Sequence, residues 1–350
     1  MGGRAAGGTG VERVKVLGIE TSCDECSAAV VDDGRTILSN IVASQIEIHR
    51  PYYGVVPELA SRKHVEWIGP VVEQSLAESG VGMGEIDAVA ATFRPGLIGS
   101  LLVGLSYGKG LALTLDLPFV GVDHIQAHLY APHLEQEISY PYIGLIVSGG
   151  HTLIARVETF DRFEVLGTTI DDACGEAFDK VAKFYDLGFP GGVAIDRLSV
   201  RGEPEAFRFP KPSLHKGDHR YDVSYSGLKT AVVNQLDRFW DRSFPKTPEN
   251  IAAAFQKTAI DILVERVLRA CKDTGLHRVV AGGGVSANSY LRSRLGSEDG
   301  VQAVFPSLSL CTDNGAMIAG LACRMLSAGK ASPLSLNAEA RVQSFRRAYP

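Results

Sequence analysis

The chain has 350 residues, of which 45% are hydrophobic and 21% are charged, and its mean hydropathy is close to zero. This length and composition predict two globular domains with sizeable cores, and they exclude a disordered or fibrous protein. The formal net charge of −5 is unusual for a protein that binds nucleic acid by itself. Any RNA-binding surface must therefore be a local basic cluster, or a partner must supply part of it.

The sequence predicts neither a membrane span nor a secreted protein. No stretch approaches the roughly 18 consecutive apolar residues of a transmembrane helix. Residues 1–13 are rich in Gly and Ala and lack the apolar segment of a secretory signal, so we expect a disordered tail and a cytoplasmic protein. Cys23 and Cys26 form one C-x-x-C without a second pair, which favours reduced thiols over a disulfide framework or a zinc site.

Strands and helices alternate along the first part of the chain. Apolar runs predict strands at residues 14–19, 27–31, 36–42, 86–92 and 119–122, with a turn at 32–34. Helical spacing predicts helices at 61–79, 99–113 and 124–134. In the first of these helices the predicted apolar stripe is Val65, Ile68, Val72 and Leu76, and Pro70 predicts a kink.

The same order of elements begins again at residue 142. Strands are expected at 142–147, 153–157, 163–167 and 277–281, and helices at 175–185, 248–274, from 286 onward and at 313–327. The polar segment 204–221 is expected to be a loop. A strand, a hydroxyl-rich or Gly-rich turn and a second strand thus occur at 14–31 and again at 142–157. This repetition predicts a duplicated α/β fold, with two lobes and a cleft between them.

We expect the first lobe at 14–123 and the second at 124–312. The helix at 313–328 is expected to return to the first lobe, and residues 329–350 to form a C-terminal tail.

Two histidines are the first candidate ligands for a metal. His124 and His128 are four residues apart on a predicted helix, so both imidazoles lie on one face. Two unrelated histidines remain an equal alternative. A zinc peptidase would carry its Glu directly after the first histidine, where this chain has Ile125. Asp313 is a candidate third ligand, and capping of the following helix is its structural alternative.

Two Gly-rich turns are candidates for holding a phosphate. Residues 148–152 follow a predicted strand, and residues 281–288 lie between a strand and a helix, where a nucleotide would meet the helix N-terminus. Either one alone is more often a plain tight turn. Acidic residues in the segments 171–180 and 190–196 could accept ribose hydroxyls, or could simply favour a helix N-terminus.

Together these segments resemble one family, the tRNA threonylcarbamoyladenosine transferases of the bacterial type, formerly described as glycoproteases. The resemblance covers residues 14 to 328. It rests on nine ordered motifs: GIETSCDE at 18–25, VVPELASR at 55–62, PGLIGSLLVG at 95–104, the histidine pair, VSGGHT at 147–152, GEAFDKVAK at 175–183, SYSGLKT at 224–230, GGVSAN at 283–288 and TDNGAMIA at 312–319.

The resemblance implies the actin-like ATPase fold and one Fe²⁺ or Zn²⁺ per chain, bound by His124, His128 and Asp313. It implies transfer of threonylcarbamoyl from threonylcarbamoyl-AMP to N6 of adenosine 37, beside the anticodon of tRNAs that read codons beginning with adenine. Implied partners are tRNA, a paralogous actin-like subunit and a small ATPase subunit. The implied substrate-binding residues are Ile146, Val147, Ser148, Gly149, Gly150, Asp179, Gly192, Asp196 and Asn288.

The chain departs from the family pattern in three places. Arg94 and Tyr53 stand where glycine is usual, and Ile125, Gln126 and Ala127 stand where the bacterial pattern is Met-Glu-Gly. No general base is evident, and Glu20 at the end of the first strand is a guess. A metallopeptidase, another ATPase or kinase of this superfold, and a non-catalytic paralogous subunit are the alternatives. A basic stretch from Arg201 to Lys229, including Arg208, Lys211 and Lys216, is a candidate tRNA surface, with a solvated loop as its equal alternative.

Overall fold

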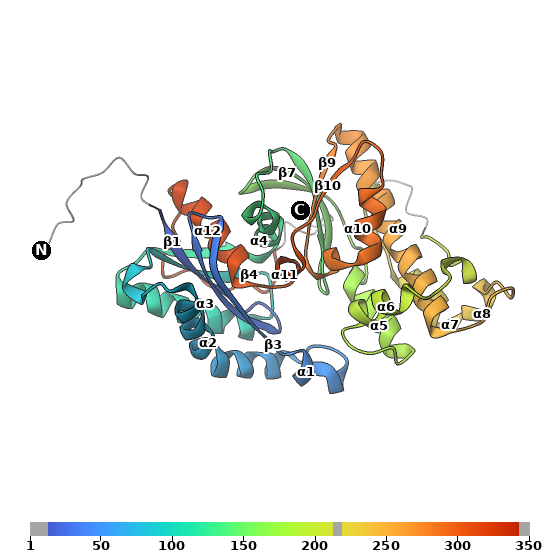
Figure 1. Ribbon diagram of the computed structural model, residues 1–350, viewed down its shortest axis with the longest axis horizontal. Coiled ribbons are helices and arrows are strands. Elements are labelled where there is room, and N and C mark those ends of the chain that lie inside the picture. The colour runs from blue at the N-terminus through green and yellow to red at the C-terminus, as the bar shows by residue number, and fades with distance from the viewer. Residues whose placement is uncertain (1–12, 213–218, 343–350) are drawn as a thin grey trace, which may run out of the picture.

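The computed structural model describes residues 13–212 and 219–342. It shows two lobes side by side, each built on one sheet, and the chain passes from the first lobe to the second after β5 (Figure 1). The predicted disordered tail at 1–13 lies outside the described residues except for Arg13, and Lys216 of the basic stretch also lies outside them.

The first sheet has five strands in the order β3-β2-β1-β4-β5. The first three strands are antiparallel neighbours, and β4 and β5 continue the sheet in parallel with β1. The strands are β1 (Lys15–Glu20), β2 (Glu25–Asp32), β3 (Thr36–Ser44), β4 (Ala88–Arg94) and β5 (Phe119–Asp123).

The second sheet repeats this topology, which confirms the predicted duplication. Its order is β10-β9-β6-β7-β8, so the first strand of the lobe is again central, with two antiparallel strands on one side and two parallel strands on the other. The strands are β6 (Tyr142–Val147), β7 (Thr152–Thr159), β8 (Arg162–Thr168), β9 (Arg278–Gly282) and β10 (Gln302–Val304). The short strand β10 was not predicted.

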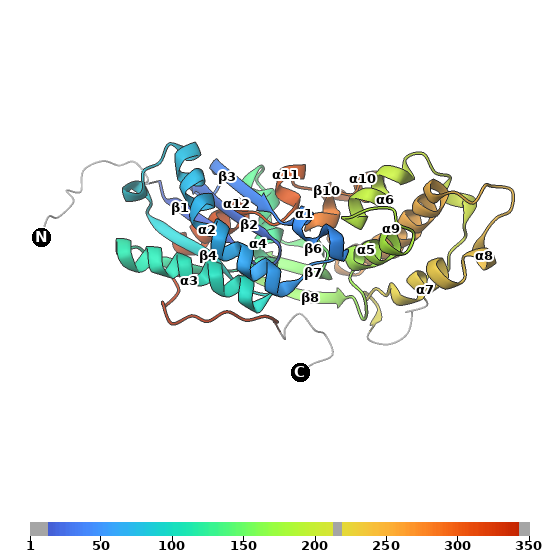
Figure 2. The same cartoon turned by 90° about the horizontal axis from the view of Figure 1, so that it is seen from below.

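Helices cover both faces of the first sheet. On one face, α2 (Pro57–Ser79) and α3 (Ile98–Leu115) pack against side chains such as Leu17 and Val89. On the other face lies α12 (Gly315–Ser327), a helix from the end of the chain (Figure 2). The helix approaches so closely that a Cβ at Gly18 would lie 2.5 Å from the backbone nitrogen of Ala319, so only glycine fits there.

The predicted apolar stripe of α2 is wrong at one position. Val65 is 66% exposed, whereas His64 is fully buried and donates a hydrogen bond from Nε2 to the carbonyl oxygen of Cys23. A polar histidine thus occupies the buried face at this turn, while Ile68 and Val72 of the predicted stripe are buried as expected. The helix also begins at Pro57, four residues before its predicted start.

Helix α3 is long and apolar enough to span a membrane by length and composition alone. Its small residues Gly104 and Gly108 lie against Thr21, directly after β1, and Ala91 of β4, so this face of the helix belongs to the core of the lobe.

The second lobe packs around α9 (Pro248–Thr274), which has the predicted bounds and is buried along most of its length. Helix α5 (Cys174–Phe184) was predicted to within one residue. Three helices between them were missed, namely α6 (Gly191–Ser199), α7 (Ser226–Asn234) and α8 (Leu236–Phe239). The remaining short elements are α1 (Ile46–His49), η1 (Arg50–Tyr52), η2 (Met83–Glu85), η4 (Pro204–Ala206), η6 (Gly284–Ala287), α10 (Ser289–Gly296) and α11 (Leu308–Cys311).

Helix α4 (His124–Tyr130) lies where the two lobes meet. Ala127 and Tyr130 belong to the core of the first lobe, whereas Ile125 and Leu129 pack with the second sheet. The predicted helix to residue 134 continues only as a 3-10 helix, η3 (Ala131–Leu134), because Pro132 lacks the N–H that an α-helix requires.

Candidate metal and nucleotide site

The structure brings His124, His128 and Asp313 together. One ligand atom from each lies within 4.8 Å of the others. Nε2 of His128 is 3.0 Å from Oδ1 of Asp313, and Nε2 of His124 is 3.6 Å from the same oxygen. The two rings are nearly perpendicular, with centroids 4.5 Å apart. Both imidazoles therefore face one carboxylate, as the helical spacing predicts.

Asp313 is not a helix cap, which was its structural alternative. Helix α12 begins two residues later, and its N-cap is Asn314, whose side chain accepts a hydrogen bond from the Met317 amide. The carboxylate of Asp313 is thus left to face the histidines.

Asp123 fixes the start of the helix that carries both histidines. Its Oδ1 accepts hydrogen bonds from the amides of Ile125, at 3.0 Å, and Gln126, at 3.1 Å. This is an ordinary N-cap. Asp123 was not predicted as a functional residue, although an Asp directly before a predicted helix is a recognisable N-cap signal.

Glu20 lies behind His124. Its Oε2 is 3.1 Å from Nδ1 of His124 and accepts a hydrogen bond from Thr92 Oγ1 at 2.6 Å, while Oε1 accepts the Ser22 amide at 2.5 Å. The Ser22 hydroxyl also lies 3.2 Å from the same imidazole nitrogen. Glu20 is fully buried, and both of its oxygens are engaged. These contacts orient His124 so that Nε2 faces Asp313.

The charges of the cluster are strongly coupled. Burial alone would lower the pKa of His124, but the carboxylates of Asp313 and Glu20 outweigh it and raise that pKa to about 9. Burial would likewise raise the pKa of Asp313, but His124 and His128 hold it well below its usual range. Burial and the neighbouring His124 lower the pKa of His128. The site therefore favours a positive charge at its centre.

These residues fit a divalent metal ion of borderline softness. Two imidazoles and one carboxylate form a facial set that suits Fe²⁺ or Zn²⁺ and leaves further positions open. Among the described residues, Nδ1 of His128 is buried without a hydrogen-bond partner. The polar contact of this imidazole is therefore made by Nε2, which faces Asp313.

The two Gly-rich turns lie against each other. Gly283 has φ +91°, and a Cβ there would be 2.5 Å from the carbonyl oxygen of Val147. The Ser148 amide donates to the carbonyl of His151 at 2.8 Å, which closes the first turn. At Gly149 and Gly150, by contrast, a Cβ would meet nothing within 4 Å. This turn therefore leaves open space beside its backbone, as a phosphate site requires.

The first turn also lies near the metal cluster. Its His151 is largely buried, and burial together with the nearby His124 and His128 lowers the pKa of His151 to about 4. Ile146 and Val147, in contrast, have fully buried side chains in the core. Only their backbone could meet a ligand.

The predicted acidic positions divide into two groups. Asp179 accepts a hydrogen bond from the Gly191 amide at 2.7 Å, which places it beside Gly192, where a Cβ would also meet nothing within 4 Å. Asp196 instead joins Asn288, whose side-chain nitrogen lies 3.2 Å from Oδ1 of Asp196. Asn288 also caps α10 by accepting the Leu291 amide, and it donates to Gln256, a residue that the sequence analysis missed.

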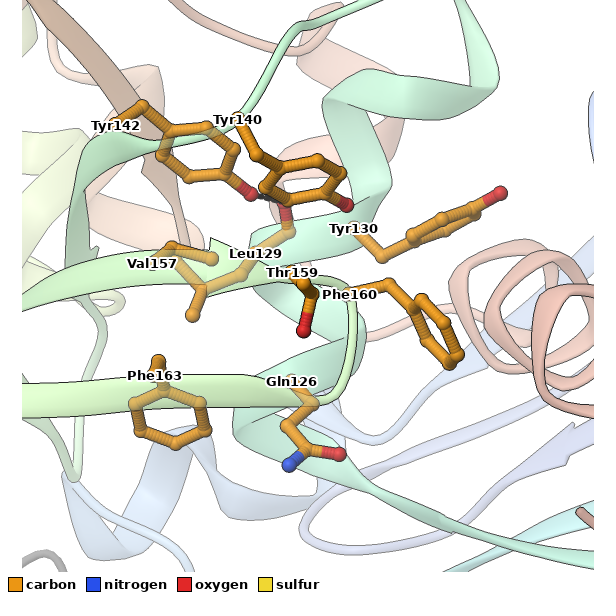
Figure 3. Close-up of a pocket in the computed structure, with 9 residues that line it drawn as sticks. All are labelled: Gln126, Leu129, Tyr130, Tyr140, Tyr142, Val157, Thr159, Phe160 and Phe163. Carbon is orange, nitrogen blue, oxygen red and sulfur yellow. Dashed lines mark hydrogen bonds between the residues drawn. The ribbon is translucent and has the colours of Figure 1, made fainter. Parts of the chain in front are cut away.

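Of the three departures from the family pattern, Gln126 lies away from the histidines. It lines a small cavity of about 10 Å³ on the other side of α4, together with Leu129 and Tyr130 of the same helix (Figure 3). A space of this size can hold one water molecule and no substrate. Tyr53 donates a hydrogen bond to Asp186 of the second lobe at 2.8 Å.

The basic stretch is largely neutralised by neighbouring carboxylates. Lys211 lies 2.5 Å from Glu265, and Arg220 forms a two-pronged contact with Asp273. Arg201, Arg208 and Lys229 also lie within 4 Å of a carboxylate, on Glu249, Asp241 and Asp172 respectively. The described part of this stretch is therefore no free cationic surface.

Comparisons with known proteins give one consistent result. The sequence profile of the family described as tRNA N6-adenosine threonylcarbamoyltransferase matches residues 36–320. A protein of that name from Treponema denticola is 61% identical over 334 residues, covering 95% of this chain and 99% of that protein. A protein of the same name from Borreliella burgdorferi is 51% identical over 336 residues, covering 96% of each.

Among solved structures, HypF of T. kodakarensis is similar, with a TM-score of 0.60 and 12% identity over 90% of this chain and 48% of that one. At this identity the likeness concerns the fold alone. It confirms the predicted actin-like ATPase fold.

Proposed function

The chain belongs to the tRNA N6-adenosine threonylcarbamoyltransferase family, and we propose that it performs this transfer where its two lobes meet, at His124, His128, Asp313 and the adjoining Gly-rich turns. The reaction moves a threonylcarbamoyl group to N6 of an adenosine in tRNA, which is an acyl transfer. The observation that carries the location is the convergence of two buried histidines and a half-buried aspartate, together with the nearby turn that has open space at Gly149 and Gly150.

We propose that one Fe²⁺ or Zn²⁺ ion is held by His124, His128 and Asp313. When bound, such an ion supplies Lewis-acid polarisation of a carbonyl oxygen and a fixed point for donor oxygens. The chain itself supplies the orientation, because Glu20 and Ser22 hold Nδ1 of His124 and leave Nε2 for the ion.

Glu20 fits this positioning role better than that of a free general base. A base must reach a proton on the substrate, whereas Glu20 is fully buried and both its oxygens already accept hydrogen bonds. We therefore assign no general base to the reaction.

The donor that fits the remaining features is an acyl adenylate, threonylcarbamoyl-AMP. The backbone of Ser148, Gly149 and Gly150 would hold its phosphate, since N–H groups there border open space. Asp179 beside Gly192, and Asp196 with Asn288, would accept its ribose hydroxyls. Ile146 and Val147 would contribute backbone only. The departing AMP would then leave from the second lobe.

The acceptor is the adenosine of tRNA, and we propose position 37, beside the anticodon, in tRNAs that read codons beginning with adenine. The net charge of −5 and the paired basic residues support a shared RNA surface, completed by a paralogous actin-like subunit and a small ATPase subunit. A cytoplasmic location follows from this substrate. Nothing favours a metallopeptidase or a non-catalytic subunit, since Ile125 stands where the peptidase needs its Glu and the ligand set is complete.

An assay with the purified chain, a donor-synthesising enzyme, partner subunits and unmodified tRNA tests the proposal. Digestion of the tRNA and mass analysis should show adenosine carrying a threonylcarbamoyl group, and omission of the chain should abolish it. Unmodified adenosine in the complete mixture would contradict the proposal.

A further inference from the structure

A bulge in β4 directs two of its side chains toward the two carboxylates that hold His124 in place, those of Glu20 and Asp123. Thr92 pairs with Val122, but Arg94 pairs with Asp123, so two steps on β4 oppose one step on β5 and Phe93 is the extra residue. β-Bulges re-aim side chains and are over-represented beside active sites, and they are rare between parallel strands such as these. Here Thr92 donates to Glu20 behind the imidazole, while Arg94 reaches the aspartate that begins helix α4.

Arg94 completes the hydrogen bonding of Asp123. Oδ1 of Asp123 caps α4, and Oδ2 accepts a hydrogen bond from Nε of Arg94 at 3.0 Å. Asp123 is only 3% exposed, so its carboxylate has little water to replace a lost partner. With both oxygens engaged, the carboxylate cannot rotate, and the first turn of α4, which begins with His124, is held in place.

The C-terminal segment from Ser332 to Ala340 holds Arg94 from the other side. Glu339 accepts a hydrogen bond from Nη1 of Arg94 at 3.2 Å, and its amide donates to the carbonyl of Phe93 at 2.9 Å. The amide of Gly96 donates to Ala340, so the segment brackets the bulge. At the beginning of the segment, the amide of Ser332 donates a hydrogen bond to the carbonyl of Phe119, at the start of β5.

We propose that Arg94 is a positioning residue of the metal site, and that the C-terminal segment 332–340 helps to hold Arg94 in position. Arg94 links Glu339 to Asp123, and Asp123 sets the first turn of the helix that presents His124 and His128. This inference rests on the proposed metal site. It gives a structural role to Arg94, which stands where the family pattern has glycine, and to residues 332–340, which were predicted to be part of a C-terminal tail.

The measurement is the affinity of the full-length chain for Co²⁺ and Zn²⁺, by chelator competition, with the visible spectrum of bound Co²⁺ as a report on ligand geometry. We expect Arg94→Ala to weaken binding about tenfold, within the range known for residues behind metal ligands, and to alter the Co²⁺ bands. Arg94→Lys keeps the charge and should recover part of the affinity. Glu339→Gln should have a smaller effect that vanishes when Arg94 is already alanine.

Arg62→Ala is the matched control, because Arg62 pairs with Glu58 on an exposed helix face and touches nothing at the site. It should leave affinity and spectrum unchanged. If Arg94→Ala is too unstable to purify, Arg94→Lys and Glu339→Gln carry the test by themselves. Wild-type affinity and an unchanged spectrum in the Arg94 and Glu339 variants would overturn the inference. If the wild-type chain binds no metal, or a His124→Ala/His128→Ala chain binds it equally well, the proposed metal site itself fails.

Discussion

His124 and His128 are the side chains whose removal should separate metal binding from folding. Both belong to a short helix whose cap, Asp123, and apolar contacts through Ile125 and Ala127 remain after their replacement. We therefore expect His124→Ala/His128→Ala to fold and to lose its metal, from about one ion per chain to less than about a tenth. Metal analysis of the purified protein checks this. His277→Ala, at an exposed position, is the control, and an unchanged metal content in the double variant would contradict the assignment.

Gly149 tests the nucleotide position in the same way. A Cβ there would meet no protein atom within 4 Å, so Gly149→Val should fold normally yet fill the space that a phosphate needs. We expect AMP affinity to fall at least about tenfold. Gly110→Val adds the same side chain to similarly open space on α3 and should bind AMP like the wild type. Equal affinity in both variants would place the nucleotide elsewhere.

Asp179 gives nucleotide binding a pH dependence of predictable sign. Burial raises the pKa of Asp179 to about 6, although the amides of Gly191 and Gly192 oppose that shift. The carboxylate is therefore charged above pH 6, where it accepts a ribose hydroxyl strongly, and neutral below it. The affinity for adenosine, which unlike AMP carries no phosphate that titrates in this range, should decline several-fold from pH 7 to pH 5. In Asp179→Asn it should be weaker throughout and flat with pH, and a parallel decline in that variant would rule out Asp179 as the cause.

At the level of elements, η3 (Ala131–Leu134) places a buried histidine among aromatic rings. Nε2 of His133 lies 3.1 Å from the Tyr142 hydroxyl, and its ring stacks on Tyr130 and Tyr140. Burial, followed by the charges of Arg35 and Arg324, lowers the pKa of His133 to about 4. The folded protein thus keeps this imidazole neutral at pH values where the unfolded chain, with a pKa near 6.5, protonates it.

The free energy of unfolding should therefore fall as the pH drops from about 6.5 to about 4, and this effect should level off below that. The contribution of His133 is at most about 3 kcal/mol. The free energies of unfolding of His133→Gln and of the wild type, measured in urea at several pH values, isolate the contribution of His133. The variant should lose less stability over this interval, and identical pH profiles would contradict the prediction.

Most helices and strands could be predicted from hydrophobic periodicity. The elements that were missed were missed for physical reasons. The long helix α9 and the central strands carry strong apolar patterns, so they lie where they were expected. Helices α6 and α7 are short and open with Gly191 and Ser226, so they resemble loops in the sequence. The strand bulge at Phe93 was beyond prediction, because it depends on the pairing of β4 with β5.

For the whole molecule, the duplicated topology explains how residues far apart in sequence form one site. Glu20 ends the first strand of one lobe, and Ser148 follows the first strand of the other, so equivalent turns face the same junction. The sequence could give the identity of the ligands through the histidine spacing and the family motifs. It could not give the contacts of Glu20 with Thr92 and His124, or that of Arg94 with Glu339, because these partners lie 72 or more positions away.

Charge distribution at this scale predicts weak binding of tRNA by the isolated chain. The candidate basic residues Arg208 and Lys211 already have carboxylate partners, so few counterions are released on binding RNA. The salt dependence of tRNA affinity should be shallow for the chain alone and steeper with its partner subunits. Arg208→Ala/Lys211→Ala should change affinity less than about twofold. A steep salt dependence that this double variant abolishes would restore the segment as the RNA surface.

The most direct test of the central claim is the rate of a single round of transfer by His128→Ala, measured with saturating threonylcarbamoyl-AMP, tRNA and partner subunits. His128 is fully buried and contacts Asp313, whereas the open backbone at Gly149 and Gly150 lies on a separate turn. We predict a rate at least about a hundredfold below that of the wild type, with AMP affinity within about twofold of the wild-type value. A variant that modifies tRNA at the wild-type rate would contradict the assignment of this site to the reaction.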